Sequence, residues 1–195
     1  ISTGMATIAE IDEAVTAARE AGCNDLVLLK CTSTYPASPE NSNLLTIPHM
    51  RELFDCVVGL SDHTMGVGTS IAAVAHGATV IEKHFTLARS DGGVDSAFSL
   101  EPDEMQSLVI ETKRAWQSLG MVSYGATGYE EKSKIFRRSL YVSEDMSAGD
   151  VFTEKNLRIV RPGFGLAPKY YDKLLGTKVR NKMKKGTPLS WNSWR

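Results

Sequence analysis

Two histidines follow apolar segments at a spacing that could bring them together. His63 lies in GLSDHT and His84 in IEKHF, 21 residues later, which is about the length of one strand-and-helix repeat. Imidazole is a common ligand of Mn, Fe and Zn, so two rings at the ends of neighbouring strands would form a candidate metal site, with the choice of metal open. The alternative is one core histidine and one loop histidine.

A carboxylate, Glu82, stands two residues before His84. Because side chains alternate between the two faces of a strand, Glu82 shares a face with His84, and Ser61 shares one with His63. Glu82 could be a further metal ligand, support a ligand, or carry a proton in catalysis. A structural salt bridge is the alternative.

Hydroxyl groups end three of the predicted strands, at Ser2, Ser33 and Ser61. Hydroxyls beside helix N-termini are suitable partners for a phosphate, although each serine could equally cap a helix. Tyr35 shares a face with Ser33, and Asp95 lies in the loop DGGVDSAFS at 91–99. This aspartate could bind hydroxyl groups or make a turn.

Strands and helices that alternate along residues 1–120 would position these side chains. The sequence predicts strands at 1–5, 25–33, 56–61 and 79–85, and helices at 6–22, 69–78 and 101–120. Thr7 and Glu10 have the spacing of a capping box, and Pro102 suits a first helical turn. The last predicted helix has an apolar stripe at Met105, Leu108, Val109, Trp116 and Leu119, which we expect to be buried.

This alternation predicts an α/β fold with a parallel sheet whose faces are covered by helices or strand-end loops. Four strand-and-helix units are half of a (β/α)8 TIM barrel, and polar residues at the carboxyl ends of its strands would build the site. An open, doubly wound sheet is the alternative. The chain starts inside an apparent strand, so we expect a fragment of a longer protein.

Composition narrows the class of protein. The chain has 195 residues, 42% of them hydrophobic, without an apolar run near the about 20 residues that span a bilayer. We therefore expect a cytoplasmic protein. Cys23, Cys31 and Cys56 lack CxxC spacing and are expected to be reduced core residues.

Charge divides the chain into two parts. Residues 1–133 contain 8 Lys and Arg against 18 Asp and Glu, whereas residues 134–195 contain 14 against 5. A basic part could contact nucleic acid, an anionic substrate or an acidic surface of the same protein. We expect a barrel domain at 1–120, a linker at 121–133 and a second domain at 134–195.

The second domain is predicted to be a compact β module with a faint internal repeat. Met146, Gly149 and Phe152 recur 37 residues later as Met183, Gly186 and Leu189, which suggests two related turns. Coincidence of turn residues is the alternative.

Seven motifs in order resemble the sialic acid synthase family over nearly the whole chain: ISTGMA, LLKCTSTYPA, GLSDHT, IEKHF, GGVDSAFSLEP, FRRSLYV and RPGFGL. The resemblance implies the second half of a (β/α)8 TIM barrel followed by a small β-rich antifreeze-like (SAF, β-clip) domain. It also implies condensation of phosphoenolpyruvate with an N-acetylated amino sugar, with release of phosphate and with a divalent metal, Mn²⁺ or Mg²⁺.

The resemblance also assigns roles to residues. It places the metal on His63 and His84 and phosphate contacts on Ser2, Ser33 and Ser61, while Tyr35 and Asp95 would contact the sugar and Glu82 would line the reacting centre. Arg161 matches an arginine that reaches from the antifreeze-like domain into the barrel of the partner subunit. A domain-swapped homodimer follows, with neither nucleic acid nor a membrane as a partner.

Departures from the family pattern refine these expectations. The early-strand lysines and acidic residue of the family are absent, so we expect the chain to be inactive alone. Lys30 and Ser33 stand where a bacterial sialic acid synthase would have His and Asn, which favours 6-deoxy-2,4-diacetamido-altrose as the sugar and pseudaminic acid as the product. N-acetylneuraminate and legionaminate synthesis are alternatives.

Two further classes of protein stay open at this point. One is a metal-dependent aldolase or isomerase built on the same barrel. The other is a non-catalytic module that binds an anion or a carbohydrate.

Overall fold

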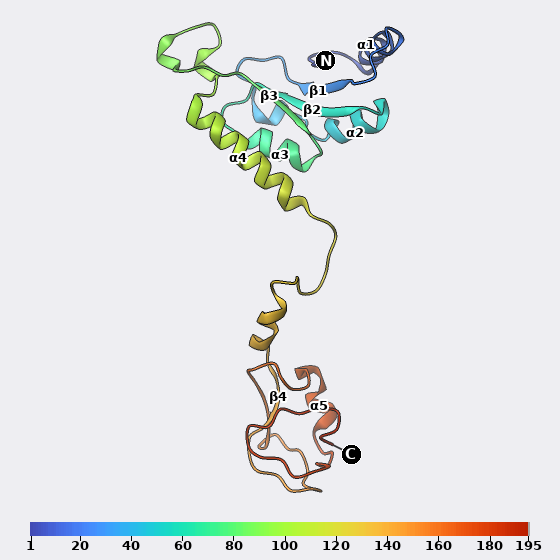
Figure 1. The fold of residues 1–195 in the computed structure, drawn as a ribbon, viewed down its shortest axis with the longest axis vertical. Coiled ribbons are helices and arrows are strands. Elements are labelled where there is room, and N and C mark those ends of the chain that lie inside the picture. Colours follow the sequence, from blue (N-terminus) through green and yellow to red (C-terminus); the bar gives the residue numbers. More distant parts are fainter. Residues whose placement is uncertain (195) are drawn as a thin grey trace. The chain divides into compact units, whose positions relative to one another are not determined.

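The structure is a computed structural model that describes residues 1–194. It divides into two compact units, unit 1 at Ile1–Met121 and unit 2 at Val122–Arg195 (Figure 1). Within residues 1–194, none of the helices is both long enough and apolar enough to cross a membrane.

Unit 1 contains a parallel sheet of three strands in chain order, β1 (Val27–Cys31), β2 (Val57–Asp62) and β3 (Val80–Lys83). The prediction of a strand at 1–5 is wrong, because the segment pairs with the sheet through a single bridge, between Ser2 and Leu29. A close turn explains this: Gly4 has φ +50°, which ends the extended segment. The four segments nevertheless follow one another without reversal, as they would in part of a barrel or in one half of a doubly wound sheet.

Four helices connect and follow the strands: α1 (Ile8–Glu20), α2 (Thr46–Phe54), α3 (Gly68–Ala75) and α4 (Pro102–Leu119). The capping box of α1 is confirmed, with Glu10 Oε2 accepting from the Thr7 backbone N–H at 2.7 Å. Short 3-10 turns lie at Pro39–Asn41, Arg89–Asp91 and Ser96–Phe98. The core between helices and sheet is apolar and contains Ile11, Val15, Leu28, Ile47, Met50, Phe54, Val58, Leu60, Ala73 and Ala78.

The opposite face of the sheet combines polar and apolar side chains. Alternation puts Leu29, Ser61 and Glu82 there, because Leu28, Val58 and Leu60 fill the core on the helix side. Part of this open face is apolar and accessible, since Val57 and Val80 are 49% and 37% exposed. In a closed barrel this face would be the interior.

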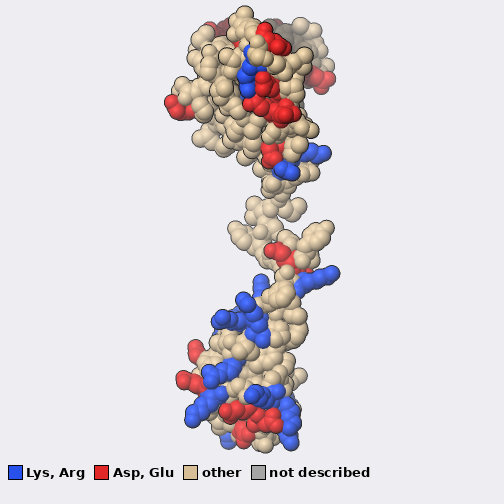
Figure 2. All heavy atoms as spheres, turned by 90° about the vertical axis from the view of Figure 1, so that its left-hand side faces the viewer, with Lys and Arg blue, Asp and Glu red and all other residues tan. Residues whose placement is uncertain are grey.

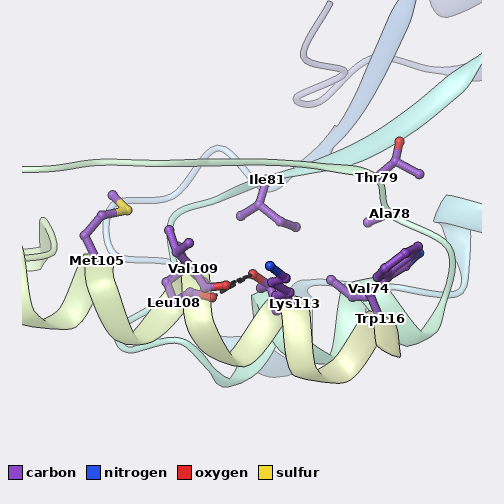
Figure 3. A pocket seen from close by; sticks show the side chains of 10 residues that line it. Val74, Ala78, Thr79, Ile81, Met105, Leu108, Val109, Lys113 and Trp116 are labelled. Carbon is purple, nitrogen blue, oxygen red and sulfur yellow. Dashed lines mark hydrogen bonds between the residues drawn. The ribbon is translucent and has the colours of Figure 1, made fainter. Parts of the chain in front are cut away.

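The expected burial of the α4 stripe is wrong in part. Leu108 is buried, but Val109 and Trp116 are 61% and 66% exposed, and Leu119 is 50% exposed. Several of these side chains line an open apolar groove of about 470 Å³ between α4, α3 and Ile81 (Figure 3). The physical reason is that α4 packs mainly on α3, which leaves the rest of its apolar surface without a cover.

Unit 2 is a small β-rich module with its own core. Its regular elements are β4 (Ser139–Val142), antiparallel to β5 (Leu157–Val160), a helical turn α5 (Tyr171–Leu174), and 3-10 turns at Glu131–Phe136 and Pro168–Tyr170. The buried core is made of Leu140, Val142, Met146, Phe152, Leu157, Leu174, Val179, Met183 and Leu189.

The internal repeat of 37 residues is confirmed as a two-fold pattern of hydrogen bonds. Met146 and Met183 exchange both backbone bonds with each other, each at 2.8 Å. Phe152 N–H donates to Thr177 O at 2.9 Å, and the equivalent Leu189 N–H donates to Leu140 O at 2.9 Å. Each half of the repeat therefore completes the backbone pairing of the other.

The two units differ in surface charge. On the face shown in Figure 2, acidic side chains prevail on unit 1 and basic side chains prevail on unit 2. The expectation that all three cysteines are core residues is wrong for Cys23, which is exposed, whereas Cys31 is buried and Cys56 is half-buried. All three are free thiols.

Candidate active site at the strand ends

The two histidines lie side by side just beyond the last residues of β2 and β3. Their ring centroids are 5.1 Å apart, and the ring planes are inclined by 72°. His63 is buried, with 7% of its surface exposed, while the His84 side chain is 31% exposed. The parallel register explains the meeting, because Asp62 and Lys83 are cross-strand partners and the histidines follow them directly.

An oxygen atom faces the Nδ1 atom of each ring. His63 Nδ1 lies 2.9 Å from the carbonyl oxygen of Thr32, and His84 Nδ1 lies 3.4 Å from Oδ2 of Asp95. A carbonyl oxygen only accepts hydrogen bonds, so His63 Nδ1 carries a hydrogen, and in the neutral imidazole Nε2 then has the lone pair that a metal needs. This is the support that metal-binding histidines usually receive from a second layer of residues.

The fit to a divalent metal therefore rests on two imidazoles. Among residues 1–194, no group of three or more His, Cys, Asp and Glu side chains is gathered as a metal cage. A metal held by His63 and His84 would draw its remaining ligands from water, substrate or another part of the protein. Mn²⁺ and Mg²⁺ accept such oxygen ligands, and imidazole suits Mn²⁺ better than Mg²⁺.

Two aromatic side chains enclose the histidines. The Tyr35 ring lies 4.4 Å from that of His63 and 6.1 Å from that of His84, and Tyr35 is 55% exposed. Phe98 is buried, 5.1 Å from the His84 ring. The sequence prediction missed Phe98, although its place in the loop with Asp95 was a usable signal. The Tyr35 and Phe98 rings are also neighbours of each other, with centroids 5.9 Å apart.

Ser61 and Glu82 form a hydrogen-bonded pair on the open face of the sheet. They are cross-strand partners, and Ser61 Oγ donates to Glu82 Oε1 at 2.7 Å. Ser61 is buried whereas Glu82 is exposed. A hydroxyl has one hydrogen, so Ser61 could donate to a phosphate only after it leaves Glu82.

Ser2 and Ser33 lie at the ends of the neighbouring segments. Ser2 is exposed and forms the bridge to Leu29, and Ser33 Oγ comes so close to Gly4 that a Cβ there would lie 3.2 Å away. Nearby, Lys30 Nζ donates to the Cys31 carbonyl at 2.8 Å. Burial lowers the pKa of the Lys30 ammonium group from its usual value.

A buried ion pair lies behind the histidines on the helix side of the sheet. Lys83 Nζ is 2.9 Å from Asp62 Oδ2, and the two side chains are 2% and 1% exposed. The sequence prediction did not include either residue as functional. The signal was present, since SDH and EKH repeat an ionisable residue before each histidine.

Arg161 belongs to unit 2, where it follows β5 directly and is exposed. Its predicted contact with the barrel of a partner subunit stays a prediction.

Residues 1–124 match the NeuB family, and residues 137–193 match the SAF domain. The chain is 44% identical to a pseudaminic acid synthase of Campylobacter jejuni over 97% of the chain and 55% of that protein. It is 39% identical to an N,N'-diacetyllegionaminic acid synthase of the same species, over 90% of the chain and 54% of that protein. The chain thus spans about half the length of these curated relatives.

Solved structures show the same relationship. The spore coat polysaccharide biosynthesis protein SpsE of Bacillus subtilis matches with a TM-score of 0.58 and 31% identity, over 98% of this chain and 59% of that one. An N-acetylneuraminic acid synthetase of Leptospira borgpetersenii, solved with citrate, matches with a TM-score of 0.62 and 35% identity, over 68% and 46% of the two chains.

Proposed function

Because the chain belongs to the NeuB family and carries a SAF domain, we propose that it is the second half of a nonulosonic acid synthase. Such an enzyme would condense phosphoenolpyruvate with the open-chain aldehyde of an N-acetylated amino sugar. The relatives named as synthases of pseudaminic and legionaminic acid support this reaction class. The activity is that of the longer protein, since the chain spans only part of its relatives.

The observation that carries the proposal is the pair of histidines whose Nδ1 atoms face oxygen atoms. A divalent metal, Mn²⁺ or Mg²⁺, held by His63 and His84 would act as a Lewis acid on the aldehyde oxygen of the sugar. Tyr35 and Asp95 lie beside the same two rings, and there they would contact the sugar. Ser2 and Ser33, with Ser61 once it leaves Glu82, would contact the phosphate.

The reaction forms a carbon–carbon bond, adds water and breaks the carbon–oxygen bond to phosphate. C3 of phosphoenolpyruvate bonds to the aldehyde carbon, and the aldehyde oxygen gains a proton to become a hydroxyl. Water then adds at C2, and cleavage of the C2–O bond releases inorganic phosphate and leaves a nine-carbon 2-keto acid. Glu82, aligned by Ser61, would accept the proton of the attacking water.

The sugar we propose is 6-deoxy-2,4-diacetamido-altrose, which would give pseudaminic acid. Of the relatives reported above, the pseudaminic acid synthase is somewhat more similar to this chain than the legionaminic acid synthase. Lys30 and Ser33, at the end of β1, support the same choice. We further propose that Arg161 contacts the active site of the partner subunit in a homodimer.

The experiment replaces each histidine in a protein of the relatives' full length that contains this chain. We expect His63→Ala and His84→Ala each to weaken Mn²⁺ binding at least about tenfold, and to slow phosphate release from phosphoenolpyruvate. Mn²⁺ binding is measured by electron paramagnetic resonance and phosphate by a colorimetric assay. His49→Ala, at an exposed histidine of α2, is the matched control.

Loss of rate with unchanged Mn²⁺ affinity would contradict the metal site. Turnover of a sugar without consumption of phosphoenolpyruvate would instead indicate an aldolase or isomerase.

A further inference from the structure

We propose that the buried Asp62–Lys83 ion pair is a clamp that sets the spacing of His63 and His84. The inference rests on the proposed function, because it assigns positioning residues to the same site. Each member of the pair directly precedes one of the histidines, and the two are partners in the register between β2 and β3. The ion pair thus joins the two strands at their last residues, one peptide bond before each imidazole.

The clamp acts through the backbone and not through contact with substrate. Side chains alternate along a strand, so Asp62 and Lys83 point to the helix side, opposite to Ser61 and Glu82, while the histidines that follow pack against Tyr35 and Phe98. Neither histidine lies within its strand, since β2 ends at Asp62 and β3 ends at Lys83. The regular ladder of the sheet therefore stops before the histidines, and other contacts must hold them.

Asp62 fixes the turn that carries His63. Its Oδ1 atom accepts hydrogen bonds from the Thr64 backbone N–H and from Thr64 Oγ1, both at 2.8 Å. Lys83 Nζ donates to the carbonyl oxygen of the same Thr64 at 2.5 Å. The residues on both sides of His63 are thus held by one ion pair, in the manner of an aspartate-stabilised turn.

The pair also ties the turn to α3. Asp62 Oδ2 accepts from Ser70 Oγ at 2.6 Å as well as from Lys83 at 2.9 Å, and Ser70 is fully buried. Both carboxylate oxygens therefore have two donors each. A carboxylate near the start of a helix is also favoured by the helix dipole.

Stability alone does not account for a buried ion pair in this place. Removing two charges from water is costly, and apolar side chains of similar volume often give equal or greater stability. What the charges add is a fixed geometry between two strand ends. A fixed distance between the two strand ends is needed if His63 and His84 bind the same metal ion.

The test removes both charges together, so that no unpaired charge stays buried. We expect Asp62→Asn combined with Lys83→Met to fold with a melting temperature within about 5 °C of the parent protein. Its Mn²⁺ affinity should fall about tenfold or more, as expected when the support of metal ligands is lost. With Mn²⁺ in excess, kcat should fall while the KM for phosphoenolpyruvate changes less than about twofold.

Controls separate the clamp from general destabilisation and from the proposed function itself. Val15→Ala opens a cavity in the core beneath α1 and should lower the melting temperature without changing Mn²⁺ affinity. Binding is measured on the 195-residue chain and on a protein of the relatives' length that contains it, which also serves for the kinetics. If the two histidine variants leave Mn²⁺ affinity unchanged, the metal site of the proposed function is wrong, and the clamp has no metal site to support.

If the histidine variants lose Mn²⁺ but the double variant matches the parent in affinity and kcat, the clamp is wrong. The clamp is also wrong if Mn²⁺ affinity follows melting temperature alike in the double variant and Val15→Ala. Should the double variant not fold, Ser70→Ala removes one bond to Asp62: a loss of Mn²⁺ affinity of about threefold or more supports the clamp, and unchanged affinity overturns it.

Discussion

The oxygen atoms beside His63 and His84 determine what the two rings can do. Thr32 contributes a backbone carbonyl and Asp95 a carboxylate, so one ring is held by a strand-end loop and the other by a long loop after β3. The Asp95 contact is longer, at 3.4 Å, and its carboxylate is 45% exposed. Because the Asp95 side chain is exposed, a substitution there can test its role beside His84 without disturbing the core.

We expect Asp95→Asn to weaken Mn²⁺ binding by about 10-fold to 100-fold, because the amide loses the negative charge that favours a hydrogen on His84 Nδ1. The stability of the protein should be nearly unchanged, since the carboxylate is half-exposed. Calorimetric titration measures Mn²⁺ affinity, and a thermal melt measures stability. Asp91→Asn, an exposed residue of the same loop, is the control. If Asp95→Asn and Asp91→Asn bind Mn²⁺ with equal affinity, Asp95 does not support the metal site.

Residue types and spacing predicted that His63 and His84 lie close together. In a parallel sheet, residues one strand-and-helix repeat apart come to lie next to each other on neighbouring strands. Residue spacing also predicted that Ser61 shares a face with His63 and Glu82 with His84, but it did not predict the hydrogen bond between Ser61 and Glu82. Spacing did not reveal the Asp62–Lys83 pair. A charged residue next to a histidine looks like an exposed polar residue until the helix that covers it is in place.

The elements of unit 2 show how a weak repeat becomes a fold. The equivalent bonds of Met146 and Met183 join the two halves at one point, where both side chains are buried. Because the contact is shared, a change on either side should damage the same packing. We therefore expect the losses in unfolding free energy from the two changes to be less than additive.

We expect Met146→Ala and Met183→Ala each to lower the free energy of unfolding by about 2–4 kcal/mol. The double variant should cost less than the sum of the two, because each single change already opens the same contact. Denaturant unfolding of unit 2, monitored by tryptophan fluorescence, measures this. Val160→Ala, at a 42% exposed position of β5, is the control. Full additivity would mean that the two side chains do not share a cavity.

Other elements mark where sequence patterns reach their limit. The pattern of α4 correctly predicted a long amphipathic helix that starts at Pro102, yet Val109 and Trp116 are not covered. An apolar stripe indicates that a helix packs against another surface. It does not indicate whether that surface belongs to the same chain. The strand at 1–5 failed for a different reason, since a turn at Gly4 shortened it to a single bridge.

At the scale of the whole molecule, the separation of charge is the feature with a measurable consequence. Residues 1–133 carry an excess of acidic side chains and residues 134–195 an excess of basic ones. In the homodimer that we propose, the basic domain of one subunit meets the acidic barrel of the other. Contacts between exposed charges are screened within about 8 Å at physiological salt and about 3 Å at 1 M salt.

We therefore expect the dimer of a protein of the relatives' length to weaken at least about tenfold between low and high salt. Sedimentation equilibrium in NaCl measures the dissociation constant. Sucrose at matched viscosity, which does not screen charge, is the control. A dimer that is unaffected or strengthened by salt would indicate an interface made of apolar contacts.

The reciprocal pairing inside unit 2 has a further result for how molecules of this protein meet one another. A segment that is built to bond with its own duplicate recognises the same duplicate in a neighbouring molecule equally well. The connection between the two halves favours the internal partner by keeping it at a high effective concentration. When molecules are crowded to a comparable concentration, as during expression or refolding, halves can be exchanged between chains, and the product is an intertwined pair in which every backbone bond is native.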